Sequence, residues 1–333
     1  MCNNIQTVGA KKNRLFYIDA LRGFAIVLVI IGHLPAYSFW GWGKGISTLG
    51  PMVGIFHMPL FMMISGYVTN INTLNLQRKA KLLIPFFVFG ILFILYFGST
   101  ITDFITSEPK AGYWFLWAIF VFYVFIFIIK QTKCNLLLGM IGVEILFMTL
   151  HFLLRRTIPG TTLSTDHLWN LWPYFSLGIL LRGNLFQKIL NKSLPIFIVN
   201  IILIIIIKYV LSITSGEAAL KLIGSIMAFP ICINLLLAFY YLEEWFKGKQ
   251  SRCKTLIKKI GNDIGTNTLQ IYVIHYFILM TVPLKPLGTY LLEHNIVFLE
   301  YIISPIFAVI ISYICIFIAK LIYKVKLGFV FGR

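Results

Sequence analysis

Long apolar segments separated by short polar ones run through almost the whole sequence. A helix needs about 20 apolar residues to cross the hydrocarbon core of a bilayer, and stretches of that length recur here between basic or Gly- and Pro-containing breaks. The pattern predicts an all-α integral membrane protein with about ten transmembrane helices. The predicted spans are residues 16–35, 51–70, 83–101, 113–130, 135–153, 169–183, 194–212, 218–241, 264–283 and 297–323.

The composition agrees with this pattern. Hydrophobic residues make up 59% of the 333 residues, charged residues make up only 12%, and the mean hydropathy is +0.87. Because soluble domains usually hold about 25% charged residues, the chain leaves little room for a separate soluble domain. We predict a cytoplasmic N-terminal segment at residues 1–15, a ten-helix membrane domain at 16–323 and a basic cytoplasmic tail at 324–333.

The net charge of +18 is unevenly distributed. With the N-terminus in the cytoplasm, 21 of the 29 Lys and Arg residues fall in inner segments, as the positive-inside rule requires. This predicts that both termini are cytoplasmic, in a multi-pass protein of the cell membrane (a bacterial inner or plasma membrane). A basic inner surface suits membrane lipids with anionic headgroups and a phosphorylated cosubstrate. Nothing in the sequence resembles a nucleic-acid-binding module.

Three ionisable residues interrupt the first apolar segment: Asp19, Arg22 and His33. Such side chains are costly inside a membrane unless they are paired or face water, so each is a candidate functional residue. At about 100° and 1.5 Å per residue, Arg22 and His33 lie about 20° apart around the helix and roughly 16 Å apart along it. Asp19 lies one turn before Arg22. The spacing predicts a polar cavity beside this face. The alternative is that Asp19 and Arg22 snorkel to one interface and His33 caps the other end.

Other polar residues fall where they can meet the same cavity. His57 lies near the outer half of the second span, as His33 does in the first, although a lone His can simply bond a backbone carbonyl. Arg78 and Lys81 share one face of a basic inner segment, which either clamps a phosphate or only sets the topology. Glu144, in the middle of the fifth span, needs a partner or a proton. The five cysteines have no metal-binding spacing, so no metal is expected.

Several motifs resemble acyltransferase family 3, a family of membrane proteins that transfer acyl groups from acyl-CoA to sugars of surface polysaccharides. Asp-x-x-Arg-Gly followed by His, at residues 19–33, resembles the family's first helix. Phe-His-Met-Pro-Leu-Phe and Ser-Gly-Tyr, at 56–67, resemble its second. The basic pair before a Leu-x-Pro run, Trp-Phe-Leu at 114–116, Leu-Trp-Pro-Tyr at 171–174 and Ile-Tyr-x-x-His at 271–275 resemble later segments. The family often has Arg where Lys81 stands, and Lys lacks the bidentate fork.

The resemblance implies an acyl-CoA-dependent O-acetyltransferase with acetyl-CoA as cosubstrate and a saccharide acceptor, polymeric or lipid-linked. His33 would be the general base or a transient acetyl carrier. Arg22, oriented by Asp19, would share the site. Arg78 and Lys81 would bind the phosphates of acyl-CoA. The expected substrate or cavity residues are His57, Ser65, Tyr67, Trp114 and His275, with donors around Ser65 also expected to stabilise an oxyanion.

A transporter or flippase of a lipid-linked saccharide is the main alternative. Ten spans with broken helices and intramembrane charges fit a transporter equally well. The sequence shows no internal inverted repeat, however, and its polar residues cluster in the first three helices. A polysaccharide polymerase usually carries a large outer loop, and no predicted outer loop is large. These features favour the enzyme.

Overall fold

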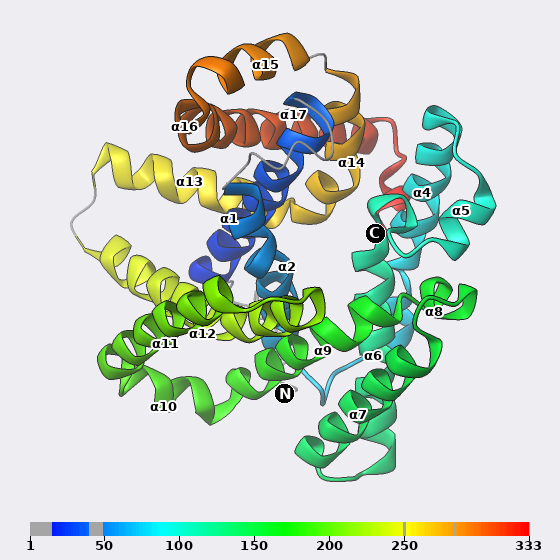
Figure 1. Cartoon of the computed structure of the whole chain (residues 1–333), viewed down its shortest axis with the longest axis vertical. Helices are drawn as coiled ribbons and strands as arrows, with labels where there is room; N and C mark the ends of the chain where they lie inside the picture. Colours follow the sequence, from blue (N-terminus) through cyan, green and yellow to red (C-terminus); the bar gives the residue numbers. More distant parts are fainter. Residues whose placement is uncertain (1–14, 40–48, 249–250, 283, 333) are drawn as a thin grey trace, which may run out of the picture.

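The computed structural model describes residues 15–39, 49–248, 251–282 and 284–332, and every regular element within them is helical (Figure 1). The predicted N-terminal segment 1–15 lies outside the described residues except for its last residue. The first half holds α1 (Phe16–Leu34), η1 (Pro35–Phe39), α2 (Leu49–Tyr67), α3 (Leu76–Ala80), α4 (Leu83–Phe97), α5 (Ile101–Thr106), η2 (Lys110–Gly112), α6 (Trp114–Thr132), α7 (Leu136–Leu154) and α8 (Ile158–Leu163). The second half holds α9 (Thr165–Leu180), η3 (Leu181–Leu185), α10 (Phe186–Leu190), α11 (Ser193–Ile213), α12 (Glu217–Lys247), α13 (Arg252–Thr266), α14 (Thr268–Thr281), α15 (Lys285–His294), α16 (Ile296–Phe298), η4 (Leu299–Ile303), α17 (Ser304–Lys324) and η5 (Gly328–Phe331).

The predicted class, an all-α membrane protein, is confirmed. Among the described residues, eight helical segments are long and apolar enough to cross a membrane. The number becomes nine if α14 and α15, which bend by 80° at a short break, count as one span. The predicted count of ten is therefore not reached by length and composition.

Two of the predicted spans account for the difference. The sixth corresponds to α9, which has only 16 residues and ends shortly before Gly183, whose φ and ψ are not helical. The ninth was expected to begin at residue 264, but that residue belongs to α13. Asn267 separates α13 from α14: its φ of −113° and ψ of 20° are not helical, and its side-chain Nδ2 donates to the carbonyl of Asp263 at 2.8 Å.

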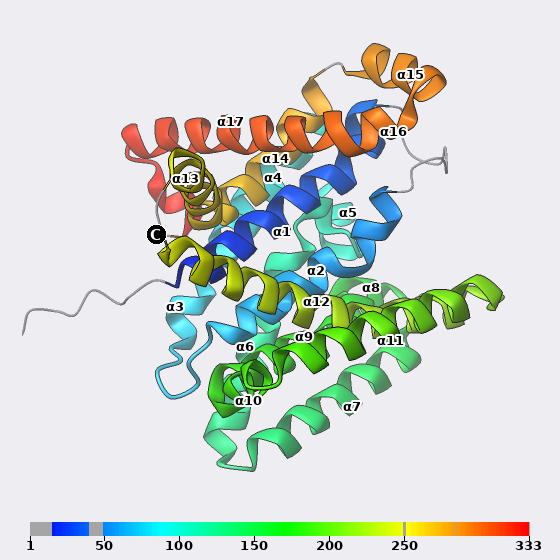
Figure 2. The ribbon, with the colours of Figure 1, turned by 90° about the vertical axis from the view of Figure 1, so that its left-hand side faces the viewer.

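Helix α1 lies at the centre of the bundle and α11 at its edge. In α1 and the π-helical segment η1 that follows it, 72% of the span is buried, against 6% for α11. Helices α2, α12, α13, α14 and α17 all pack against α1 (Figures 1 and 2). Helix α11 packs mainly on α12, where Asn200 Nδ2 donates to Asn234 Oδ1 at 2.8 Å. Polar residues placed on α1 are therefore enclosed by protein.

The described ends of the chain lie on one side of the bundle (Figure 2). Helices α3, α10 and α13, which carry the predicted inner basic segments, lie towards that side, and α8 and α15 lie towards the other. We call these the terminal side and the opposite side. This arrangement agrees with the prediction that both termini share one side of the membrane; that this side is the cytoplasm stays a prediction.

Helices α2 and α9 approach each other at glycines. A Cβ atom built on Gly178 would lie 2.0 Å from the backbone oxygen of Met63, and one built on Gly66 would lie 2.0 Å from that of Phe175. Only hydrogen fits at either position, so the two backbones pack in direct contact. This contact fixes the part of α2 that carries Ser65 and Tyr67.

Candidate active site

The acidic and basic residues of α1 form an ion pair. Arg22 Nη1 lies 3.6 Å from Asp19 Oδ1, and the two residues are three positions apart on the helix. Asp19 is buried, and Arg22 is partly exposed. The prediction placed these residues on one face, and the structure brings them together. Because the carboxylate holds the guanidinium, the direction of the Arg22 side chain is restricted.

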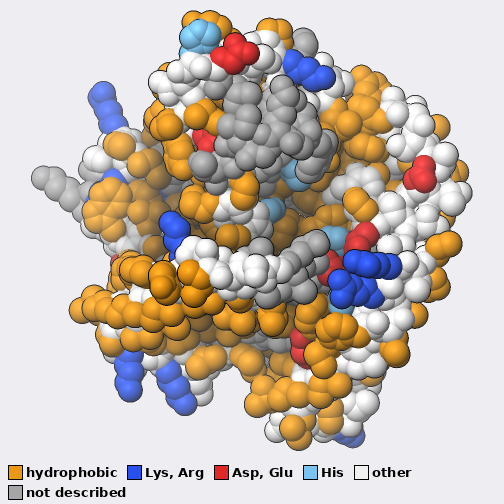
Figure 3. Space-filling model, viewed as in Figure 1, with side chains coloured by type: hydrophobic (Ala, Val, Ile, Leu, Met, Phe, Trp, Pro, Cys, Tyr) orange, Lys and Arg blue, Asp and Glu red, His pale blue; other side chains and the backbone are white. Residues whose placement is uncertain are grey.

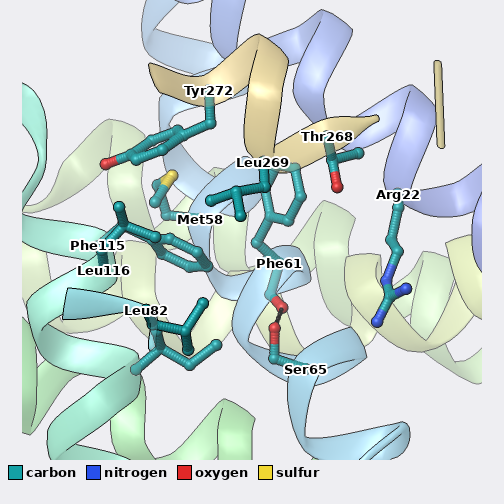
Figure 4. Close-up of a pocket in the computed structure, with 11 residues that line it drawn as sticks. Arg22, Met58, Phe61, Ser65, Leu82, Phe115, Leu116, Thr268, Leu269 and Tyr272 are labelled. Carbon is teal, nitrogen blue, oxygen red and sulfur yellow. Dashed lines mark hydrogen bonds between the residues drawn. The ribbon is translucent and has the colours of Figure 1, made fainter. Parts of the chain in front are cut away.

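A cavity of about 210 Å³ adjoins this pair (Figure 4). Arg22 is its only lining residue from α1, and its side chain points towards Ser65 of α2. Phe115 of α6 lies across from Arg22, and Thr268 and Tyr272 of α14 cover the space between. Most of the remaining wall is apolar. A narrow apolar cavity with a cation at one end suits a flexible chain that carries an anionic group.

His33 lies further along α1 and contacts α14. The Nε2 atom of His33 is 3.1 Å from the hydroxyl oxygen of Tyr276, a hydrogen-bonding distance. The His33 ring also lies near the rings of His275 and Tyr37, with centroid distances of 5.7 and 5.5 Å. Tyr272, which lines the cavity, has its ring centroid 6.0 Å from that of His275. The histidine cluster therefore adjoins the cavity through Tyr272.

Two further histidines are fixed by backbone carbonyls. His57 Nδ1 lies 2.8 Å from the carbonyl oxygen of Val53, and His275 Nδ1 lies 2.7 Å from that of Tyr272. Because a carbonyl only accepts hydrogen bonds, these Nδ1 atoms carry the hydrogen and each neutral ring presents a lone pair at Nε2. The backbone bond considered for His57 is present, and neither His57 nor His275 is among the residues that line the cavity.

The backbone around Tyr276 is fixed from η2 and α6. The hydroxyl of Tyr113 donates to the Val273 carbonyl at 3.0 Å, and the hydroxyl of Tyr272 donates to the Gly112 carbonyl at 2.7 Å. Gly112 has φ +87°, and a Cβ atom there would lie 2.6 Å from the Tyr276 ring. Glycine is required at this position for both reasons. The contact of His33 with Tyr276 is thus set by several segments.

Two of the expected residues at the terminal side are exposed. Arg78 lies on α3 and Lys81 is the cap residue that follows it, and neither lines the cavity. The next residue, Leu82, does line it. The basic pair therefore lies beside one end of the cavity, with both side chains open to solvent. Such a position fits phosphate groups outside the cavity.

Of three other residues expected at the cavity, Ser65 lines it, whereas Tyr67 and Trp114 do not. Tyr67 does not line the cavity, and its hydroxyl pairs with the hydroxyl of Tyr17 at 2.7 Å. Trp114 stacks on His167, with ring centroids 3.9 Å apart. Ser65 lines the cavity, but its hydroxyl donates to the Phe61 carbonyl at 2.8 Å. That hydrogen is already used, so the structure gives Ser65 no spare donor for an oxyanion.

Sequence reasoning did not single out Tyr276. The available signal was the run Tyr272, His275, Tyr276, which places three polar rings on one face of a helix.

Figure 3 shows the opposite side of the protein, where a hollow opens near the middle and histidine side chains are visible in its wall. In the part of the chain that the structure describes, no group of three His, Cys, Asp or Glu residues is arranged to hold a metal ion.

Comparison with known proteins places this arrangement in a family. The family model described as an acyltransferase domain, that of acyltransferase family 3, matches residues 15–319. The chain therefore belongs to this family and is a membrane acyltransferase, which confirms the resemblance seen in its motifs.

Two relatives are nodulation proteins. Nodulation protein NolL of Mesorhizobium japonicum is 29% identical over 191 residues, which cover 50% of this chain and 48% of that protein. Nodulation protein NolL of Sinorhizobium fredii is 28% identical over 213 residues, which cover 56% of this chain and 54% of that protein. The matched part thus spans about half the length of these curated relatives. No solved structure matches the chain.

Proposed function

We propose that this protein transfers an acetyl group from cytoplasmic acetyl-CoA to a hydroxyl group of a saccharide, which is lipid-linked or part of a cell-surface polysaccharide. The observation that carries the proposal is the position of His33. This residue lies on α1, the helix that also supplies Arg22 to the cavity, and it is hydrogen-bonded to Tyr276 of α14. The proposed location is the cell membrane, with the terminal side in the cytoplasm.

In the proposed reaction, His33 acts as general base. The acceptor hydroxyl loses its proton to a ring nitrogen of His33, and its oxygen attacks the carbonyl carbon of the thioester. The tetrahedral intermediate then collapses, the carbon–sulfur bond breaks, and the CoA sulfur takes the proton from the imidazolium. The products are an acetyl ester and CoA with a free thiol. The second route is a transient acetyl-His33, formed and then resolved by the same hydroxyl.

The remaining site residues bind and orient the donor. In this proposal the pantetheine arm of acetyl-CoA lies in the cavity, and the phosphates lie near Arg78 and Lys81 at its terminal side. Arg22, held by Asp19, supplies a positive charge inside the cavity. Tyr276 orients the His33 ring through the contact of 3.1 Å. His57 and His275 contribute lone pairs near the reacting atoms.

The test uses purified protein in nanodiscs with acetyl-CoA that is labelled in the acetyl group. His33→Ala should abolish acetyl transfer to saccharide acceptors, while His294→Ala, a change at an exposed histidine on α15, should leave it intact. Transfer by His33→Ala at the wild-type rate would exclude the proposed base. Wild-type protein that neither binds nor consumes acetyl-CoA would favour the transporter alternative.

Arg22→Lys provides a second measurement. Lysine keeps the charge but cannot make two parallel hydrogen bonds, so we expect at least a tenfold lower kcat/KM, or about 1.4 kcal/mol of transition-state stabilisation. Protein that is expressed normally and retains full activity would show that Arg22 supplies only charge.

A further inference from the structure

Helix α13 has an apolar stripe that the described residues leave partly uncovered. Leu256 is 57% exposed and Ile257 is 44% exposed, although the end of the same helix, at Ile264, is buried. Figure 2 shows α13 nearly end-on, crossing the long helices on the terminal side of the protein. The stripe repeats at helical spacing and consists of Cys253, Leu256, Ile257, Ile260 and Ile264.

Cations flank this stripe. The helix has four basic residues, Arg252, Lys254, Lys258 and Lys259, and one acidic residue, Asp263. The ammonium of Lys254 lies 3.9 Å from the ring centroid of Trp245 and donates to the Trp245 carbonyl at 2.9 Å. The ammonium of Lys258 lies 5.6 Å from the centroid of Phe16. Trp245 is itself 54% exposed. Exposed aliphatic residues, a Trp and several lysines together are typical of a helix at a membrane surface.

We propose that the first half of α13 is an interfacial helix that binds anionic phospholipids of the terminal-side leaflet. Leu256 and Ile257 would enter the boundary between headgroups and acyl chains, and the lysines would contact the lipid phosphates. A soluble nucleotide offers phosphates but gives no reason for two neighbouring aliphatic side chains to be exposed beside them. The combination of apolar and basic residues therefore favours a lipid.

The other half of α13 contacts the helix that carries the active site. A Cβ atom on Gly265 would lie 1.8 Å from the carbonyl oxygen of Asp19, and one on Gly23 would lie 3.1 Å from that of Gly261. The two helices thus meet backbone to backbone at the turn that forms the Asp19–Arg22 pair. Anchoring α13 in the leaflet holds this turn in place, so anionic lipid should increase acetyl transfer. This coupling rests on the proposed function, whereas the lipid contact does not.

The first test locates the helix. The test uses two variants, Leu256→Cys and Thr255→Cys, in a background in which Cys2, Cys134 and Cys253 are replaced by serine. Each new cysteine is labelled with an environment-sensitive fluorophore, and the protein is placed in nanodiscs. Nitroxide-labelled lipid should quench the label at position 256, and aqueous iodide should quench the label at position 255, which lies off the apolar stripe. Equal quenching of both labels by iodide would overturn the proposal, whether or not the protein is an acyltransferase.

The second test measures lipid dependence in nanodiscs of phosphatidylcholine with or without phosphatidylglycerol. Lys258→Gln with Lys259→Gln should lose the stimulation by phosphatidylglycerol and bind that lipid roughly fivefold more weakly for each lysine removed. Lys188→Gln with Lys192→Gln removes the same charge from exposed positions on the same side and should keep the stimulation. A higher KM for acetyl-CoA with unchanged lipid dependence would identify a nucleotide site and overturn the proposal. If the label at position 256 lies in the lipid but anionic lipid does not change the rate of wild-type acetyl transfer, the coupling between α13 and the active site is overturned.

Discussion

At the scale of single residues, the Tyr276 hydroxyl is the contact that distinguishes His33 from a histidine at a helix end. The oxygen lies 3.1 Å from His33 Nε2, and the two residues are 243 positions apart in the sequence. Helix geometry alone predicted the alignment of Asp19, Arg22 and His33, because these residues share one helix. No pattern in the sequence predicts a partner on a distant helix, since that contact depends on how α1 and α14 pack.

Tyr276→Phe should lower kcat about tenfold, because His33 loses the hydrogen bond that orients it, worth about 1.4 kcal/mol. The KM for acetyl-CoA should change little, since Tyr276 does not line the cavity in which the donor is proposed to bind. Single-turnover transfer with labelled acetyl-CoA measures the effect. Tyr209→Phe, at an exposed position on α11, is the matched control. An unchanged kcat in Tyr276→Phe would show that the contact does not orient the base.

Lys110 joins three segments on the opposite side through its ammonium group. The residue is 2% exposed, and Nζ donates to the carbonyls of Ile105, Ser107 and Thr161 at 2.9, 3.2 and 3.4 Å. Lys110→Met removes these bonds and should lower the free energy of unfolding by about 2 kcal/mol. Thermal unfolding in detergent measures the loss; a midpoint equal to that of wild type would contradict the assigned role.

Burial lowers the pKa of Lys110 to about 8, and the carboxylate of Glu108 opposes this shift. Between that value and the ordinary lysine pKa, 10.5, the unfolded chain binds more protons than the folded protein. The contribution of Lys110 to stability therefore rises as the pH increases through this window. The difference in midpoint between wild type and Lys110→Met should grow from pH 8 to pH 10, and a constant difference would argue against the shift.

At the scale of helices, close packing decides where glycine is needed. At Gly178 a methyl group would lie 2.0 Å from the Met63 carbonyl oxygen, whereas at Gly142 in α7 it would meet nothing within 4 Å. Both glycines lie inside apolar helices, so the sequence does not tell them apart. The difference arises because α9 packs on α2 over its length, while this face of α7 is open.

Gly178→Ala should destabilise the protein by about 2 kcal/mol or more through overpacking, and it should disturb the cavity wall formed by α2. Gly142→Ala should be neutral or stabilise by up to about 1 kcal/mol, because alanine is the better helix former. Unfolding midpoints of the two variants provide the comparison. Similar midpoints for both would mean that α2 and α9 separate easily.

At the scale of the whole molecule, the sequence predicted the class but not every crossing, and the assignment of the sides stays a prediction. Length and apolarity identify the eight long segments. The same criteria fail at α9 and α14, and α14 has only 14 residues. A short helix that is surrounded by protein does not have to match the bilayer thickness. The basic pair Arg78 and Lys81 could be recognised in the sequence from its charge. Their exposure beside the cavity depends on the orientation of α3, which is set by tertiary packing.

Cysteine labelling tests the sides directly. Cys134, between α6 and α7, is exposed and lies in a predicted inner segment. A membrane-impermeant maleimide should label Cys134 only after the cells are permeabilised, while Thr162→Cys on α8 should react in intact cells. Cys232 and Cys315 are buried and should not react. Labelling of Cys134 in intact cells would show that the orientation of the bundle is the reverse of the predicted one.

Two hydrogen bonds between α11 and α12 determine how the outermost helix can move. Most of α11 is exposed; Ser193 at its start pairs with the hydroxyl of Tyr241, and the Asn200 amide donates to Asn234 further along the helix. Hydrocarbon offers an amide no substitute partner, so rotating α11 about its axis or sliding it by one turn would strand two polar groups at a cost of several kcal/mol. Because these two bonds lie at separate points along α11, both would have to break before the helix could slide along α12.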